Sequence, residues 1–245
     1  MVAQRTGELQ TTNTRLEGAN AELETFAYSV SHDLRTPLRA VDGFSRILIE
    51  DYAPKLDAEG QRIINVVREA TKKMAQMIDD ILAFSRAGRL ELQKAPVDMA
   101  ALARSVWEEL QASRGERSIA FELGELPVVD GDAAMLRRVW QNLLDNAIKY
   151  TGPKPDARVE VRADAADGEI VFCVRDNGVG FDMAYVDKLW GVFQRLHGAE
   201  FPGSGIGLAI IKRIVGRHGG RVWAEGKVGE GASFHFTIPT RKDAA

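Results

Sequence analysis

The sequence predicts a two-part protein: an all-α helical hairpin forming a dimeric four-helix bundle, followed by an α/β sandwich domain. Two observations indicate this division. Apolar residues recur at helical and heptad spacing along the first part of the chain, whereas short strand-like runs alternate with amphipathic helices over the last part. A length of 245 residues is enough for two ordinary domains.

Composition is that of a folded, soluble protein, with 45% hydrophobic and 27% charged residues. A net charge of −3 gives no basic field that would attract nucleic acid or an anionic membrane. The single cysteine, Cys173, excludes an internal disulfide and fits a reducing compartment. No apolar run approaches the roughly 18 residues of a membrane span. We therefore expect a cytoplasmic chain whose partners include neither nucleic acid nor, in this fragment, a membrane, although the full-length protein could be membrane-anchored.

Residues 1–27 are expected to form a coiled-coil signalling helix. Leu9, Leu16, Leu23 and Val30 recur every seven residues, with polar residues between them. A heptad seam needs a second helix to cover it. The alternative is a frayed linker helix, because so short a run is a weak signal. Since the heptads begin at once, we expect an N-terminal sensor domain, missing from this chain, in the longer protein.

Residues 28–94 are expected to form the dimerisation hairpin. The apolar stripe of the first helix continues through Val41, Phe44 and Leu48, and a turn follows at residues 52–60, which include a proline and a glycine. The second helix carries two parallel apolar rows. These rows comprise Ile63, Ile64, Val67, Ala70, Met74, Met77, Ile78, Ile81 and Phe84. Two helices cannot hide that much apolar surface, so we expect a homodimer.

His32 lies about 200° round the first helix from Val30 and therefore points away from the apolar seam. An outward imidazole is largely neutral at pH 7 and leaves one ring nitrogen free as a nucleophile. Thr36 follows one turn later on the same face, Asp33 could accept a proton, and Pro37 should bend the helix. A solvated histidine beside an incidental kink is the alternative interpretation of this motif alone.

After Gly88 the periodicity changes, and we place the domain boundary near residue 95. Residues 92–99 (LQKAPVDM) are interpreted as a linker because they contain a proline. Helices are expected at 97–110, 133–150 and 206–218, and strands at 119–123, 159–161, 170–174, 222–224 and 233–238. Cys173 is expected to be a core residue, and His218 and His235 to be structural rather than metal ligands.

The helix at 133–150 carries Asn142, Asn146 and Lys149 along one polar face. Asparagine is neutral to unfavourable inside a helix, so two on one face suggest a function. Amide oxygens suit Mg²⁺, which shares its remaining ligands with water and phosphate, and a lysine suits the phosphates. An ordinary solvated helix face is the alternative.

DNGVGFD follows directly on an apolar strand, which places Asp176 at the strand end. A carboxylate there can accept a hydrogen bond from the exocyclic amine of adenine. Gly178 and Gly180 would permit positive φ or a close approach of the backbone. A plain Asp-Asn-Gly turn explains the same residues equally well.

GSGIGLAI places Gly203, Gly205 and Gly207 before an apolar helix, whose free N–H groups would suit a phosphate. The spacing matches neither the dinucleotide fingerprint nor the P-loop. Residues 182–203 are long enough for a lid over bound nucleotide. Within them, Arg195 and His197 are candidate phosphate contacts, although charged residues of this kind are often only solvated.

In this order and spacing the motifs resemble the catalytic core of sensor histidine kinases of two-component systems. SHDLRTP resembles that family's phosphoacceptor box, QNLLDNAIKYT its N box, and DNGVGFD, GSGIGLAI and GEGASF its glycine boxes. LWGVFQRL resembles the phenylalanine box, with Trp190 where phenylalanine often stands. The run VFQRLH is similar to kinases attached to phytochrome-like photosensors.

The resemblance implies an ATP-binding domain, residues 95–245, of the histidine kinase, gyrase and heat-shock chaperone type. It implies phosphorylation of His32, with Asp33 assisting and Thr36 serving a reverse phosphatase reaction. It implies Asn146 as the main Mg²⁺ ligand and Asp176 as the adenine contact. The remaining nucleotide contacts that it implies are Asn142, Lys149, Tyr150 and the loop glycines.

The resulting expectation is an enzyme that transfers a phosphoryl group from Mg-ATP to His32 and then to an aspartate of a response-regulator receiver domain. Gyrase-like ATPases, heat-shock chaperones and serine-phosphorylating kinases of the same superfamily are rivals, but they lack an upstream SHDLRTP hairpin. A second rival is a scaffold of the same fold that acts mainly as a response-regulator phosphatase or binding module. The intact polar residues of the N box and the complete GSGIG argue against it.

Overall fold

The structure, a computed structural model, divides into two compact units, Met1–Arg86 and Ala87–Ala245. It describes residues 29–31, 33–86, 91–112, 117–166, 168–198, 200–201 and 203–240. The coiled coil expected over residues 1–27 and the candidate nucleophile His32 lie outside the described residues. Each unit is described by itself below.

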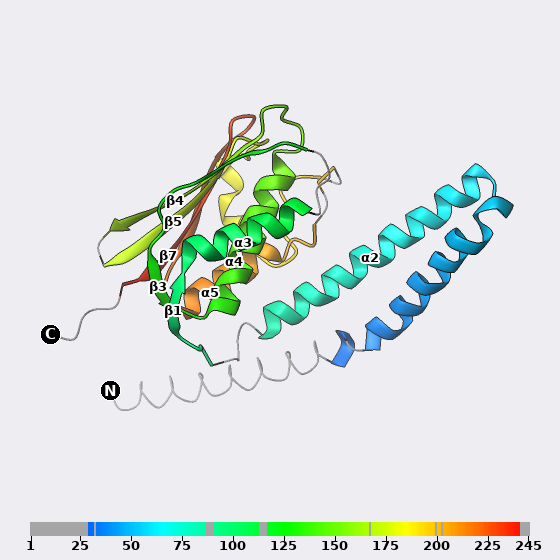
Figure 1. Cartoon of the computed structure of the whole chain (residues 1–245), viewed down its shortest axis with the longest axis horizontal. Helices are drawn as coiled ribbons and strands as arrows, with labels where there is room; N and C mark the ends of the chain where they lie inside the picture. The colour runs from blue at the N-terminus through cyan, green and yellow to red at the C-terminus, as the bar shows by residue number, and fades with distance from the viewer. Residues whose placement is uncertain are drawn as a thin grey trace. The chain divides into compact units, whose positions relative to one another are not determined.

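The first unit is a helical hairpin, whose two helices lie side by side and antiparallel (blue and cyan in Figure 1). Residues 29–31 and 33–52 are helical, the 3-10 turn η1 spans Ala53–Lys55, and α2 spans Ala58–Arg86. The turn predicted across residues 52–60 is therefore confirmed.

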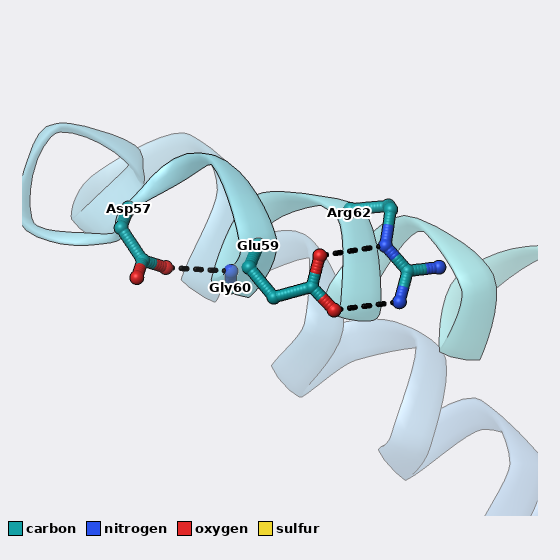
Figure 2. Close-up of polar contacts among 4 residues, drawn as sticks. All are labelled: Asp57, Glu59, Gly60 and Arg62. Carbon is teal, nitrogen blue, oxygen red and sulfur yellow. Dashed lines mark hydrogen bonds and ion pairs between the residues drawn. The ribbon is translucent and has the colours of Figure 1, made fainter.

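The first turn of α2 is stabilised by local polar contacts, which Figure 2 shows. The Asp57 carboxylate accepts the Gly60 N–H at 2.7 Å, in the manner of an N-cap. Glu59 accepts two hydrogen bonds from the Arg62 guanidinium, at 2.8 and 2.6 Å. Acidic side chains at this end also complement the positive end of the helix dipole, so α2 has a well-defined start after the turn.

The two helices of the hairpin are joined by ion pairs but leave much apolar surface exposed. Arg35 contacts Asp79 at 2.8 Å, and Arg68 lies 3.7 Å from Asp42. The large apolar side chains that stay exposed in this unit include Val30, Leu34, Val41, Phe44, Ile47, Leu48, Tyr52, Ile63, Val66, Val67 and Met74. The predicted stripe is thus present, and a single chain does not cover it.

The second unit is built on a five-stranded sheet in the order β2-β4-β5-β7-β6, with β1 and β3 forming a separate antiparallel pair. The strand β2 runs parallel to β4, and the other neighbours are antiparallel. The strands are β1 (Ala95–Asp98), β2 (Ala120–Leu123), β3 (Val128–Gly131), β4 (Arg158–Ala166), β5 (Glu169–Asp176), β6 (Val222–Lys227) and β7 (Gly231–Pro239). The helices are α3 (Met99–Ala112), α4 (Ala133–Tyr150) and α5 (Gly207–Arg217), with the 3-10 segment η2 (Met183–Trp190).

The core of this unit lies between the sheet and the three helices, which Figure 1 shows on one side of it. Trp140 of α4 is fully buried and meets Phe172 and Phe236 edge-on, with ring centroids 5.9 and 5.3 Å apart. Along β5 the buried residues alternate with half-exposed or exposed ones, as expected for a sheet with one covered face. The predicted succession of a helical hairpin and an α/β domain is confirmed.

The interpretation of residues 92–99 as a linker is wrong in its second half. Residues 95–98 form β1, which pairs with β3 in the register Ala95↔Gly131 to Asp98↔Val128. Proline is tolerated there because a two-stranded sheet consists only of edge strands. The helix expected from residue 97 begins instead at Met99, where the Asp98 carboxylate accepts the Ala101 N–H at 2.9 Å.

The prediction that Cys173 belongs to the core is also wrong. Its side chain lies on the opposite, half-exposed face of the sheet, with Sγ 3.9 Å from Nε2 of His235. The His235 ring stacks in turn on Trp223 at 4.8 Å. Partial burial still raises the pKa of the Cys173 thiol to about 11, which disfavours the reactive thiolate.

Across the described residues, no helix is both long enough and apolar enough to cross a membrane.

Candidate functional site

The helix α4 is the frame of the site, and its start is tied to the end of α5. Asp132 caps α4 by accepting the N–H groups of Ala134 and Met135 at 3.0 and 3.1 Å. The backbone N–H of Asp132 donates to Nε2 of His218 at 3.0 Å, and Nδ1 of His218 lies 2.8 Å from the carbonyl of Ile214. These partners assign the ring proton to Nδ1, and burial lowers the pKa of His218. The predicted structural role of His218 is confirmed.

The other end of α4 is held by a residue that carries no signal in the sequence. The Arg117 guanidinium donates to the carbonyl of Ile148 at 3.1 Å and also to that of Thr151. The Thr151 hydroxyl donates to the carbonyl of Ala147 at 2.8 Å. Together these bonds satisfy carbonyls that a helix end leaves without partners. The last turn, which bears Lys149 and Tyr150, is therefore fixed.

The predicted polar face of α4 is half-buried rather than an ordinary solvated face. Nζ of Lys149 donates to Oδ1 of Asn146 at 2.9 Å and lies 4.4 Å from the centroid of the Tyr150 ring. Burial lowers the pKa of Lys149, an effect that the charge of Asp145 opposes. Nδ2 of Asn142 donates to the carbonyl of Arg138 at 2.8 Å. The structure thus places the half-buried Lys149 ammonium against the amide oxygen of Asn146.

Asp176 ends β5 and is nearly inaccessible, at 4% exposure. Its Oδ1 accepts the Gly178 N–H at 2.9 Å. Burial raises the pKa of Asp176 to about 6, against the opposing effect of hydrogen bonds from the backbone of Gly178 and Ala232. A buried carboxyl group at a strand end, aimed toward a glycine loop, fits a specific polar contact better than a plain surface turn.

The first glycine loop runs against the end of α4. A Cβ on Gly178 would lie 2.5 Å from the carbonyl oxygen of Tyr150, and the next N–H, that of Val179, donates to that same oxygen at 3.1 Å. Gly180 adopts φ +63° and packs against the carbonyl of Lys227 too closely for any side chain. A side chain at either position would collide with the backbone of a neighbouring segment, so both positions require glycine.

The second glycine loop approaches the same face of α4. A Cβ on Gly203 would lie 3.3 Å from Nζ of Lys149, and one on Gly207 would lie 2.5 Å from Oδ1 of Asn142. Gly205, between them, adopts φ +74°. Segments far apart in the sequence thus converge on Asn142, Lys149 and the C-terminal end of α4.

The segment between the loops, expected to be a lid, begins with η2, and its described residues after Trp190 form neither helix nor strand. The Tyr150 ring lies 5.1 Å from the rings of both His197 and Phe201. Arg195 donates to the carbonyls of Phe201, at 2.6 Å, and Gly198. Arg195 therefore stabilises the conformation of this segment through two backbone carbonyls. Phe201, which no sequence motif indicates, packs the segment against the Tyr150 ring.

The structure describes the residues on both sides of His32 in the phosphoacceptor motif. Asp33 and Thr36 are exposed on the first helix of the hairpin, and Arg35 between them is held by Asp79 of α2. His32 itself lies outside the described residues. The motif and the glycine loops belong to different units, so no geometry between them is described.

The donor set at α4 fits a cation that arrives with a phosphate ligand. No group of three or more histidine, cysteine, aspartate or glutamate side chains that could hold a metal ion occurs among the described residues. The donor available is the hard amide oxygen of Asn146, which already accepts a hydrogen bond from one cation, the Lys149 ammonium. Mg²⁺ keeps most of its water and phosphate ligands, so one protein oxygen is sufficient.

Family comparisons divide the chain in the same order as the fold. Residues 22–89 match the family described as His Kinase A (phospho-acceptor) domain. Residues 131–242 match the family described as histidine kinase-, DNA gyrase B- and HSP90-like ATPase. The second match contains α4, both glycine loops and the segment between them.

Full-length relatives show the same similarity across both units. The chain is 40% identical to the methanogenesis regulatory histidine kinase FilI of Methanothrix harundinacea, over 96% of this chain and 26% of that protein. It is 36% identical to cyanobacterial phytochrome B of Nostoc sp., over 97% of this chain and 32% of that protein. The chain thus spans about a third or less of the length of these relatives.

Solved structures agree with this comparison. The crystal structure of full-length ShkA in complex with AMPPNP matches 89% of this chain and 46% of that one, with a TM-score of 0.69 and 32% identity. The mycobacterial sensor histidine kinase MprB matches 60% of this chain and 98% of that one, with a TM-score of 0.53 and 32% identity.

Proposed function

Because this chain belongs to the sensor histidine kinases and carries both parts of their catalytic core, we propose that its α/β unit binds ATP and that the γ-phosphoryl group is transferred to His32. The predicted family, including its phytochrome-like group, is confirmed by the comparisons. The predicted enzyme class, an ATP-dependent protein-histidine kinase, agrees with them as well.

One observation carries the proposal: two glycine motifs converge on the helix that carries the N box. Gly178 abuts the carbonyl of Tyr150, Gly203 approaches Lys149, and Gly207 meets Asn142. Glycines leave backbone N–H groups accessible at close range, and the second loop also leads into the N-terminus of α5. A half-buried lysine between two such loops provides charge for a polyphosphate.

The proposed contacts follow from this arrangement. Asp176 accepts a hydrogen bond from the adenine amine, and Lys149 binds the phosphates. Further nucleotide contacts are assigned to Tyr150, Arg195, Gly178, Gly180, Gly203, Gly205 and Gly207. Asn142 is assigned as a supporting polar residue of the site. When bound, Mg²⁺ would neutralise phosphate charge, and Asn146 would be its protein ligand. The Lys149 ammonium, which donates to Oδ1 of Asn146 in this structure, has further N–H donors for phosphate.

The proposed transfer forms one N–P bond and breaks one P–O bond. A neutral ring nitrogen of His32 attacks the γ-phosphorus, and ADP leaves with the bridging oxygen and its electron pair. Asp33 accepts or orients the proton of the imidazolium that forms. Thr36 serves the opposing phosphatase reaction, in which a water that its hydroxyl could hold attacks the phosphorylated aspartate of the response regulator and releases inorganic phosphate. Catalysis depends mainly on positioning and charge neutralisation.

The proposed organisation has three parts: a coiled-coil signalling helix at 1–27, a dimerisation and phosphotransfer domain at 28–94, and an ATP-binding domain at 95–245. We assign the exposed stripe of the hairpin to a homodimeric four-helix bundle, since isolated monomers rarely expose so long an apolar face. The proposed partner is the receiver domain of a response regulator. The proposed location is the cytoplasm, with a sensor domain upstream in the full-length protein.

A scaffold that acts mainly as a response-regulator phosphatase or binding module is not favoured, because the polar side chains of the ATP site are present and partly buried. That alternative makes a direct prediction: the chain would bind no nucleotide. A titration with Mg-ATP therefore distinguishes the proposed kinase from this scaffold.

Autophosphorylation with radiolabelled ATP tests the proposal. We expect acid-labile labelling of the chain that His32→Ala abolishes. His235→Ala is the matched control, since His235 lies on the open face of the sheet, away from the α4 site, and should label normally. Undiminished labelling of His32→Ala would contradict the proposed phosphoacceptor.

A further inference from the structure

Gly207 is a glycine for a reason different from that of Gly205. Gly205 adopts φ +74°, which side-chain-bearing residues rarely tolerate. Gly207 is the first residue of α5 and is not among the positive-φ glycines. Its backbone conformation therefore suits alanine, which is a better helix former. An added Cβ would lie 2.5 Å from Oδ1 of Asn142, so a side chain at position 207 requires the Asn142 amide to move.

The side chain of Asn142 is held in the orientation that makes this contact. Its Nδ2 donates to the carbonyl of Arg138 one turn earlier on α4, at 2.8 Å. With the amide nitrogen engaged on its own helix, the amide oxygen is the atom nearest to the Cβ position of Gly207. Asn142 is half-buried, so both contacts lie within the packed region between α4 and α5.

The two asparagines on this face therefore do different things. Asn146 presents its Oδ1 to the ammonium of Lys149, the group proposed to bind phosphate. Asn142, one turn away, presents its Oδ1 to the backbone at the start of α5. The start of α5 is also the end of the second glycine loop, so a shift at Gly207 moves Gly203 and Gly205 with it.

We infer that Asn142 is a positioning residue that sets the approach of α5 and the second glycine loop to α4 through its contact with Gly207, and does not itself bind the nucleotide or its cation. This assignment rests on the proposed function and gives the supporting role of Asn142 a structural basis. It predicts that positions 142 and 207 are coupled, because removing one partner relieves the crowding caused by changing the other.

A double-mutant cycle tests the inference in the full chain. The variants are Gly207→Ala, Asn142→Ala and the double variant, with Gly216→Ala as the matched control. Gly216 lies in the same helix, and an added Cβ there meets no atom within 4 Å. Two quantities are measured for each variant: the midpoint of thermal unfolding, and the Kd of trinitrophenyl-ATP at several Mg²⁺ concentrations.

In the presence of Asn142, Gly207→Ala should weaken trinitrophenyl-ATP binding about tenfold and lower the unfolding midpoint, because the added methyl group forces the Asn142 amide off the Arg138 carbonyl or shifts α5. In the Asn142→Ala background the same change should weaken binding less than about twofold. It should also raise the midpoint, since alanine favours the helix. Gly216→Ala should leave the affinity unchanged in both backgrounds.

The Mg²⁺ series distinguishes positioning from direct binding. If Asn142 acts through Gly207, the fold-loss caused by Asn142→Ala is the same at every Mg²⁺ concentration. A fold-loss that changes with Mg²⁺ would overturn the inference, because it would place Asn142 on the cation. Equal effects of Gly207→Ala in both backgrounds would overturn it too, because the positions would then be independent.

Failure of the proposed function remains distinguishable from failure of this inference. If the unchanged protein binds no trinitrophenyl-ATP, the ATP site is wrong, and the coupling is then decided by unfolding midpoints alone. A fall in the midpoint caused by Gly207→Ala that disappears in the Asn142→Ala background would still establish the contact.

Discussion

The two units bury their apolar residues in different ways. In the α/β unit, Trp140, Phe172 and Phe236 have essentially no exposure, and the core is closed by a single chain. In the hairpin, Phe44 keeps 69% of its surface exposed, and the most buried apolar side chains, Leu82 and Ile78, belong to α2. The α/β unit therefore closes its core within one chain, whereas the helical unit leaves an apolar face uncovered. Stability and nucleotide binding should depend on one unit, and association on the other.

The largest effect is expected from Trp140→Ala, which removes the central side chain of the closed core. Loss of a buried tryptophan costs about 3–5 kcal/mol of the free energy of unfolding. We expect the α/β unit to unfold at much lower denaturant, while helical circular dichroism from the hairpin persists. Trp223→Ala, on the open face of the sheet, is the control and should have a far smaller effect. Loss of both units in one transition would show that they are not independent.

Phe44→Glu tests the other unit. A charge placed in a dimer interface should weaken association roughly 100-fold, as for a strong interface hot spot. Light scattering should show monomer at concentrations where the unchanged chain is a dimer, with the Kd for ATP unaltered. Arg46→Glu, on an exposed polar position of the same helix, should remain dimeric. A dimeric Phe44→Glu protein would move the interface elsewhere.

Within the catalytic unit, Lys149→Met should weaken ATP binding about 10- to 100-fold, because it removes a charged donor from a partly buried site. Isothermal titration calorimetry measures this loss. The matched control is Lys154→Met, since the Lys154 ammonium is exposed and donates to the carbonyl of Gly229. Dimerisation should be the same in both variants. Equal affinities would remove Lys149 from the phosphate site.

Because of Asp176, we expect a fall in pH to weaken ATP binding and to increase the free energy of unfolding. Its pKa is raised to about 6 by burial, so the carboxyl group gains a proton as pH falls through 6. The proposed adenine contact needs the carboxylate, and affinity should fall about tenfold between pH 7 and 5. The folded-state pKa lies above the ordinary value of 3.8, so the Asp176 contribution to the free energy of unfolding increases over the same interval.

Asp176→Asn separates this response from other titrations. The neutral amide should bind ATP weakly at both pH values, and the pH dependence of the Kd should disappear. A pH dependence that survives the substitution would have to come from another group.

The smallest effect is expected from Asp79→Asn, which breaks the ion pair with Arg35. Both side chains are substantially exposed, so the loss should be below about 1 kcal/mol in the free energy of unfolding and should vanish in high salt. Glu69→Gln, which breaks a pair within α2, is the matched comparison. A much larger loss for Asp79→Asn would mean that ion pairs, rather than the second copy, organise the hairpin.

Much of the fold could be predicted because its signals are local. The bounds of α4 follow from the capping Asp132 and the amphipathic run behind it. The strand β1 could not be predicted, because its partner among the described strands is β3, thirty to thirty-six residues later, and Pro96 argues against a strand. The face on which Cys173 lies could not be predicted, because residues 170–174 (IVFCV) are all apolar and show no alternation in sequence. The alternation of buried and half-exposed residues along β5 appears only in the structure.

The residues of the candidate site could be selected from the sequence, but their arrangement in space could not. Asn142, Lys149 and Asp176 stand out by residue type and position. The meeting of Asn142 with Gly207 joins positions 65 residues apart, and nothing local signals it. No sequence pattern indicates Arg117 or Phe201 either. Arg117 acts through backbone carbonyls and Phe201 through a ring contact, and both kinds of contact exist only in the folded chain.

The convergence of both glycine loops on α4 limits how the chain can change length. Inserting one residue between Asn142 and Tyr150 would rotate everything beyond it by about 100° and separate the contacts at the two ends. The exposed connections elsewhere in the unit carry no such constraint on length. Natural and engineered insertions should therefore collect in those connections, while the spacing from Asn142 to Tyr150 stays constant among functional variants.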